Sequence, residues 1–460
     1  MKSLGTLALC LSVATVLWLC SPAPANAQEA GTVPKPAAPQ DAPQGTGGIS
    51  SVQRLTLQDA LALARKNSVQ FQAAVTDSAI ARQDRWQAGA ALLPSVAYDN
   101  SALYSQLNPN GGVRFIANNA AHEYLSQANV HESIDLAGVS SFRRSSALAA
   151  AAKARAEIAS RGLVVTVVQD YYSVAAAQQK LLAAQKAAEE GDHFLKLTQD
   201  LEKGGEVAHS DVIKADLQAQ ERRRQLQEAQ LSLLNARLDL AVLIFPQFNE
   251  NYEAADDLHA AAPLPTLGEV QQQAARENPD VRAALETARA ASADVTGARG
   301  GYLPSLSLDY WYGIDAAQFA VNGPNGVSNL GSSAAATLNI PIWNWGTTQS
   351  RIKQAELRRA QAQRELSLAQ RKLLAEIKSL YAEAETASNE LGGLQRSADL
   401  AAESLRLTTL RYKGGEATVL EVVDAQTTNA QASAAYQDGA VRYRVALANL
   451  QTLTGVLTNP

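Results

Sequence analysis

The sequence has almost no cysteine or methionine. Its two cysteines, Cys10 and Cys20, lie near the N-terminus, and Met1 is the single methionine. The rest of the chain therefore cannot form a disulfide, a thiolate metal site or a methionine-rich copper site.

Long apolar runs are also scarce. The run from Leu7 to Leu19 is too short to span a bilayer comfortably. Because Lys2 precedes it and a small-x-small triplet follows at 25–27, residues 1–27 are predicted to be a cleaved signal peptide. Lipidation of Cys20 is an alternative, disfavoured by the bulky residues just before it. No later run reaches about 18 residues, which excludes a helical membrane protein.

Catalytic patterns and a strongly basic surface are missing as well. The formal net charge is −5 at pH 7, which argues against a nucleic-acid partner. No His-Glu-x-x-His or phosphate-loop pattern occurs, and none of the histidines pairs at ligand spacing. His209-Ser210-Asp211 is contiguous and is no triad, because triad members converge from separate positions. We therefore predict a protein that is not an enzyme and has no cofactor or metal site.

The chain that remains is rich in alanine, glutamine and leucine, with only 5% aromatic residues, a composition typical of long packed helices. Residues 28–50 are rich in proline, alanine and glycine and are expected to form a flexible linker. Thr56 and Thr266, 210 residues apart, each precede an acid by three positions, which is a capping-box spacing. We expect two internal repeats, 51–255 and 256–460.

Each repeat is expected to begin with one helix that ends at a Leu-Pro-Ser sequence, at Pro94 and Pro304. Two alternating segments follow in each repeat, which indicates strands that are apolar on one face. The first pair covers 94–105 and 124–134, and Glu132 falls on its apolar side. The second pair covers 305–314 and 334–342.

A very long helical pattern follows each strand pair, over 141–201 and 348–412, and return helices are expected over 211–245 and 420–453. Adjacent glycines end each long helix, Gly204-Gly205 before Glu206 and Gly414-Gly415 before Glu416. Thr418 is predicted to cap the second return helix together with Glu421, and Ser210 to cap the first. Each repeat thus ends in a helical hairpin.

Four amphipathic strands resemble part of an outer-membrane barrel but cannot close one alone. Open strand edges are not viable in lipid, so three copies with twelve strands would be needed. A periplasmic structural coiled coil that never enters a membrane is the alternative, although it leaves the strands unexplained.

The duplicated layout, the Leu-Pro-Ser sequences and the pattern Tyr412-x-x-Gly-x-x-Thr-x-x-Glu421-x-x-Asp424-Ala resemble the TolC-type outer-membrane efflux duct family. The resemblance covers about 55–455. It implies a mixed, mostly helical fold: a homotrimeric β-barrel with four strands per chain, set in outer-membrane lipid and continued by an α-helical coiled-coil barrel in the periplasm. It also implies a passive exit duct for an efflux or type I secretion system, docked to a periplasmic adaptor and fed by an inner-membrane transporter.

The same resemblance assigns residues at the hairpins. It implies that Glu421 and Asp424 line the periplasmic entrance and that Tyr412 and Asp211 take part in closing it. It also implies that the two glycine turns, Gly204-Gly205-Glu206 and Gly414-Gly415-Glu416, dock the adaptor. Each has a plainer alternative: the acids offset the helix dipole, Tyr412 packs at a helix end, and the glycines cap helices. Ala417 stands where the family can carry a gating arginine, so Lys214 or Lys413 would have to supply the cation.

Overall fold

The computed structural model describes residues 53–104, 122–247, 251–255, 258, 263–323 and 326–455. The chain divides into the units Met1–Ser51 and Val52–Pro460, and the fold below is that of the second. The predicted signal peptide and the linker lie outside the described residues.

The helix expected at the start of each repeat is in fact two helices. In the first predicted repeat α2 (Leu57–Asn67) is followed by α3 (Val69–Ala90), and in the second predicted repeat α6 (Leu267–Glu277) is followed by α7 (Pro279–Gly300). Ser68 and Asn278 separate them: each has an extended backbone and accepts a hydrogen bond from the backbone three residues on. A residue before proline avoids the helical conformation, so Asn278-Pro279 was a signal for this break. The capping boxes predicted at Thr56 and Thr266 are present.

Four strands form one antiparallel sheet in the order β2 (Ser95–Tyr104), β3 (His122–Ile134), β5 (Ser305–Ala316) and β6 (Leu330–Asn339). Directly paired residues of antiparallel strands lie on the same face. The register aligns Val96 with Val130, Val130 with Tyr310 and Tyr310 with Ala334, so one apolar face crosses all four strands. The predicted alternation is confirmed.

The opposite face of the sheet is largely polar. It carries Asp99, Gln127, His131 and Asp309, and the last two contact each other at 2.7 Å. Among the described residues, neither β2 nor β6 has a second strand neighbour. The sheet therefore has two open edges.

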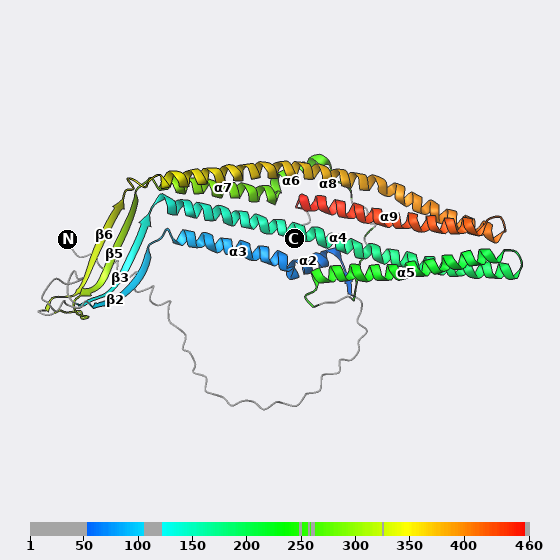
Figure 1. Cartoon of the computed structure of the whole chain (residues 1–460), viewed down its shortest axis with the longest axis horizontal. Helices are drawn as coiled ribbons and strands as arrows, with labels where there is room; N and C mark the ends of the chain where they lie inside the picture. The colour runs from blue at the N-terminus through cyan, green and yellow to red at the C-terminus, as the bar shows by residue number, and fades with distance from the viewer. Residues whose placement is uncertain are drawn as a thin grey trace, which may run out of the picture. The chain divides into compact units, whose positions relative to one another are not determined.

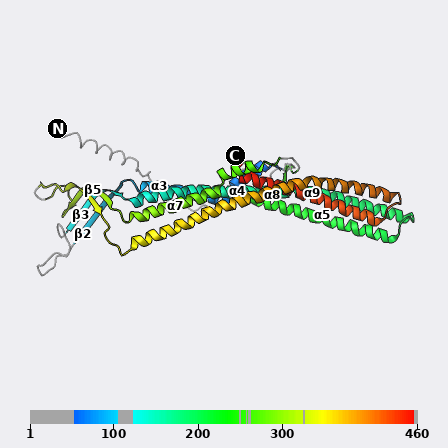
Figure 2. The same cartoon turned by 90° about the horizontal axis from the view of Figure 1, so that it is seen from above.

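Two long helical hairpins continue from the sheet. Helix α4 (Leu136–Lys203) returns as α5 (His209–Ile244), and α8 (Thr347–Lys413) returns as α9 (Val419–Leu453). At 1.5 Å per residue, α4 and α8 are each about 100 Å long. In Figure 1 the strands lie at one end of these helices and both hairpin turns at the other, and Figure 2 shows the same pairing of α4 with α5 and α8 with α9.

A small parallel sheet near the middle of the long helices was not predicted. Its strands β1 (Gln53–Leu55) and β4 (Tyr252–Ala254) come from the beginning and the end of the first predicted repeat. The buried hydroxyl of Tyr171 on α4 lies 3.1 Å from the carbonyl oxygen of Leu55 and 3.0 Å from that of Ala255. Strands of three residues are too short to show a period in the sequence, so this pairing depends on tertiary packing.

Across the described ranges, none of the helices has a stretch long and apolar enough to cross a membrane.

Candidate gate at the helical tips

The two hairpin turns have the same backbone geometry. Gly205 and Gly415 adopt left-handed conformations, with φ of 76° and 73°. The amide of the following glutamate donates to a carbonyl of the last helical turn: Glu206 to Leu201 at 2.9 Å, and Glu416 to Arg411 at 2.8 Å. This is a Schellman cap, which satisfies carbonyls that the helix end leaves open. Both glutamates and all four glycines of the turns are exposed.

The return helices begin differently in the two hairpins. Thr418 and Glu421 form the predicted capping box: the Thr418 amide donates to Oε1 of Glu421 at 3.1 Å, and the Glu421 amide donates to Oγ1 of Thr418 at 3.3 Å. The cap predicted at Ser210 is wrong, because α5 starts at His209 and its N-cap is Ala208. Alanine has no side-chain acceptor, so the first tip lacks the cap of the second.

Glu421 and Asp424 lie on the exposed surface of α9. Hydrogen bonds from the backbone and side chain of Thr418, together with the charge of Arg411, lower the pKa of Glu421. Within one chain this carboxylate is therefore stabilised in its ionised form. Asp424 has no ion pair among the described residues.

Among the described residues, the cation that forms an ion pair with Glu421 is Arg411, which was not among those proposed from the sequence. Its guanidinium lies 3.6 Å from Glu421 and donates to the carbonyl oxygen of Glu416 at 3.0 Å. Lys214 instead contacts Asp211 on its own helix, at 3.3 Å. The sequence contained a signal for the contact of Arg411 with Glu421, because residues at similar distances on either side of a hairpin turn face each other.

Tyr412 is only 4% exposed, so it packs at the helix end, as the plainer alternative expected. Its ring lies 5.1 Å from that of Phe194, and its hydroxyl is 3.4 Å from Oγ1 of Thr198. Val419 and Val422 belong to the same apolar cluster. Tyr412 therefore ties the second hairpin to α4 of the first.

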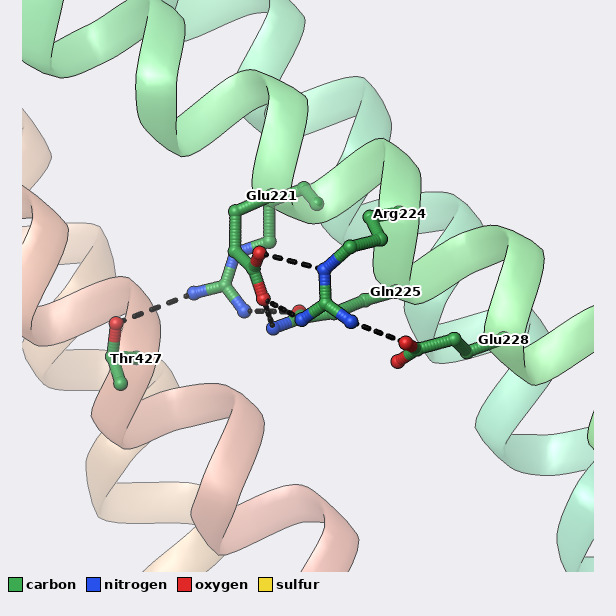
Figure 3. A network of polar contacts seen from close by, with 6 residues as sticks. Glu221, Arg224, Gln225, Glu228 and Thr427 are labelled. Atoms are coloured by element: carbon green, nitrogen blue, oxygen red, sulfur yellow. Dashed lines mark hydrogen bonds and ion pairs between the residues drawn. The ribbon is translucent and has the colours of Figure 1, made fainter.

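A second connection between the hairpins lies farther from the tips. The buried Arg222 of α5 reaches Oγ1 of Thr427 on α9 at 3.5 Å and Gln225 at 2.9 Å. Figure 3 shows the surrounding network, in which Arg224 bridges Glu221 and Glu228 along α5. The burial of Arg222 was not predicted from the sequence, because three consecutive arginines are typical of a solvent-exposed helix face.

A groove lies beside this junction. It has a volume of about 730 Å³ between α4, α8 and α9, and Gln426 at its floor is buried with an unpartnered Oε1. Among the described residues no group of three or more histidines, cysteines, aspartates or glutamates could hold a metal ion.

Comparison with known proteins places this geometry in a family. The family model for "outer membrane efflux protein" matches residues 60–244 and 270–456. The chain is 29% identical to the outer membrane protein OprJ of Pseudomonas aeruginosa, in an alignment covering 37% of this chain and 36% of OprJ. It is 23% identical to the proteases secretion protein PrtF of Dickeya chrysanthemi, over 88% of this chain and 89% of PrtF.

Among solved structures, the fold resembles that of the CmeC outer membrane channel of Campylobacter jejuni. The TM-score is 0.74 at 18% identity, covering 93% of this chain and 94% of CmeC. Because the family model covers well over half of the sequence, the chain belongs to the outer membrane efflux protein family.

Proposed function

We propose that this outer-membrane protein is the passive exit duct of a tripartite efflux or type I secretion system. The observation that carries the proposal is the sheet, which is apolar on one face, polar on the other and open at both edges. In lipid every backbone N–H and C=O must be paired, so the edges β2 and β6 need partners. Three copies, with β6 of one beside β2 of the next, give a closed barrel of twelve strands.

The helices extend this barrel into the periplasm as a second, α-helical barrel. The two units of the duct in each chain are 51–255 and 256–460, each with two strands and one long hairpin. Substrates would then pass from an inner-membrane pump through a periplasmic adaptor into the helical barrel. The role is transport and not catalysis.

The helical tips form the entrance in this proposal. Threefold symmetry would arrange the exposed acids Glu421 and Asp424 as two rings of carboxylates, which favour cations over anions. Tyr412 and Asp211 hold the closed arrangement, with Tyr412 acting from its buried position as an anchor to α4. The exposed turns 204–206 and 414–416 are the surfaces that dock the adaptor.

The family relatives support transport and leave the cargo open. PrtF is named for protease secretion, which favours the type I secretion branch, while the family name favours efflux. A periplasmic structural coiled coil is the competing function. It gives no role to a sheet whose Val96, Tyr98 and Tyr104 are all more than half exposed on one apolar face.

Disulfide trapping tests the closed barrel directly, because both native cysteines lie within the predicted signal peptide. Ser101→Cys on β2 is combined with Ser333→Cys on β6, or with a cysteine at its same-face neighbour 331 or 335. Oxidation in membranes should yield a covalent trimer on a non-reducing gel in at least one register. Each single-cysteine variant is the matched control and should stay monomeric. A protein that purifies as a water-soluble monomer and never cross-links would refute the proposal.

The entrance is tested in planar bilayers. Glu421→Gln with Asp424→Asn should lower the cation preference of the open channel, while Glu416→Gln, on the turn outside α9, should leave it unchanged. Equal effects of both variants would contradict the assignment of the rings.

A further inference from the structure

The helix segments next to the sheet carry an excess of positive charge. The nine to twelve residues at the sheet-side ends of α3, α4, α7 and α8 (82–90, 136–146, 290–300 and 347–358) contain eight lysines and arginines against three acids. The four strands contain no lysine or arginine at all. The positive charge of this region is therefore carried by the helices and not by the strands.

Among the described residues, most of these cations form no ion pair. Arg144 and Arg299 form ion pairs, with Asp294 and Glu356. The other six are exposed and have no ion pair or hydrogen bond among the described residues. We call these six residues the basic collar: Arg82, Arg85, Arg143, Arg351, Lys353 and Arg358.

Part of the collar borders a shallow pocket that also has apolar walls. The pocket, of about 410 Å³, is lined by Arg82, Arg85 and Trp86 of α3, by Leu93 just after that helix, and by Phe142 of α4. The Arg85 guanidinium lies 5.9 Å from the centre of the Phe142 ring. Trp86 is 71% exposed, and Leu93 directly precedes the Pro94 that leads into β2.

This combination of charge and apolar surface fits one kind of partner. Tryptophan is enriched where headgroups meet the hydrocarbon core, and clustered lysines and arginines beside a membrane-spanning element attract anionic lipids. The pocket is continuous in sequence with the face that the proposed function places in the membrane. We propose that the basic collar and the α3 pocket bind the headgroups of anionic phospholipids in the leaflet facing the periplasm, with Trp86 and Leu93 against the glycerol and upper acyl region.

The inference rests on the proposed function, and its test separates the two. The full-length protein is purified in detergent and placed in nanodiscs of phosphatidylethanolamine, with or without phosphatidylglycerol. Lipids that remain bound are counted by native mass spectrometry after release from the disc. Each cation near a membrane surface contributes about fivefold to binding of anionic lipid. Arg82→Gln with Arg85→Gln should therefore weaken phosphatidylglycerol retention roughly 25-fold.

A matched control removes the same charge far from the sheet. Lys378→Gln with Arg396→Gln changes two exposed cations of α8 that lie much farther from the sheet than the collar, and it should leave lipid retention unchanged. Quenching of Trp86 by brominated phosphatidylglycerol, absent in Trp86→Phe, places the lipid at the pocket.

Two outcomes would overturn the inference while leaving the duct intact. Equal retention of phosphatidylethanolamine and phosphatidylglycerol by a native trimer would show that the collar does not select anionic headgroups. Loss of the trimer in the Arg82/Arg85 variant, with no change in lipid per copy, would show that this face contacts a second copy of the chain. A water-soluble monomer would instead refute the proposed function.

Discussion

Adjacent glycines at the second hairpin tip should respond oppositely to alanine. Gly415 has a φ of 73°, whereas its neighbour Gly414 has a φ of −85°. A Cβ on Gly415 would meet nothing within 4 Å, and one on Gly414 would make an ordinary contact at 3.5 Å with the carbonyl oxygen of Arg411. Space is available at both positions, so only backbone conformation distinguishes them.

The expected magnitudes follow from that difference. An L-residue in the left-handed region costs about 1–2 kcal/mol, so Gly415→Ala should destabilise the turn by roughly 1 kcal/mol after the smaller entropy loss of alanine is counted. Gly414→Ala has an allowed backbone and should be neutral or stabilising by up to about 1 kcal/mol. The local hydrogen bond from the Glu416 amide to Arg411 reports the change.

Hydrogen–deuterium exchange of the turn provides the assay. If the free energy of opening the turn is about 1 kcal/mol lower in Gly415→Ala than in the wild type, exchange of the 411–418 segment should be about fivefold faster. Gly414→Ala should show no acceleration. Gly415→Asn should fall between wild type and Gly415→Ala, because asparagine tolerates the left-handed region. Equal acceleration by alanine at 414 and 415 would refute the conformational explanation.

Three further predictions concern the sheet and the caps. A Cβ on Gly313 would overlap the carbonyl oxygen of Ser126 and Cα of Gln127, so Gly313→Ala should abolish assembly into the outer membrane. A Cβ on Gly331 would meet nothing within 4 Å, so Gly331→Ala should be found in membrane fractions like the wild type. Ala208→Thr should supply the missing cap of α5 and stabilise its first turn by about 1 kcal/mol, measured as slower exchange at 208–212; unchanged exchange would contradict the cap difference between the tips. The pKa of Glu421 is lowered in the folded chain, so its contribution is complete above the ordinary value of 4.5 and is lost as the pH falls below it. The protection of amides 418–421, measured relative to the exchange rate of an unstructured chain at the same pH, should therefore fall in acid for the wild type but much less for Thr418→Val.

Much of the fold and some of the tip were predictable from the sequence because they depend on neighbours along the chain. Helical and alternating periods, the Thr418 capping box and the double-glycine turns all involve residues within a few positions of one another. The errors arose where a local signal was weak or misread. Ser210 was chosen as a cap although Ala208 occupies the repeat position of Thr418, and the break at Asn278 was overlooked.

Tertiary structure decided which side chains face each other across the hairpins. The burial of Tyr412 against Phe194 joins residues more than two hundred positions apart, and the contact of Arg411 with Glu421 requires the chain to reverse. The pairing of β3 with β5, which makes one sheet from two halves, is likewise a long-range contact. Local sequence preferences determine individual elements, whereas the position of each element against the others depends on packing that no short stretch encodes.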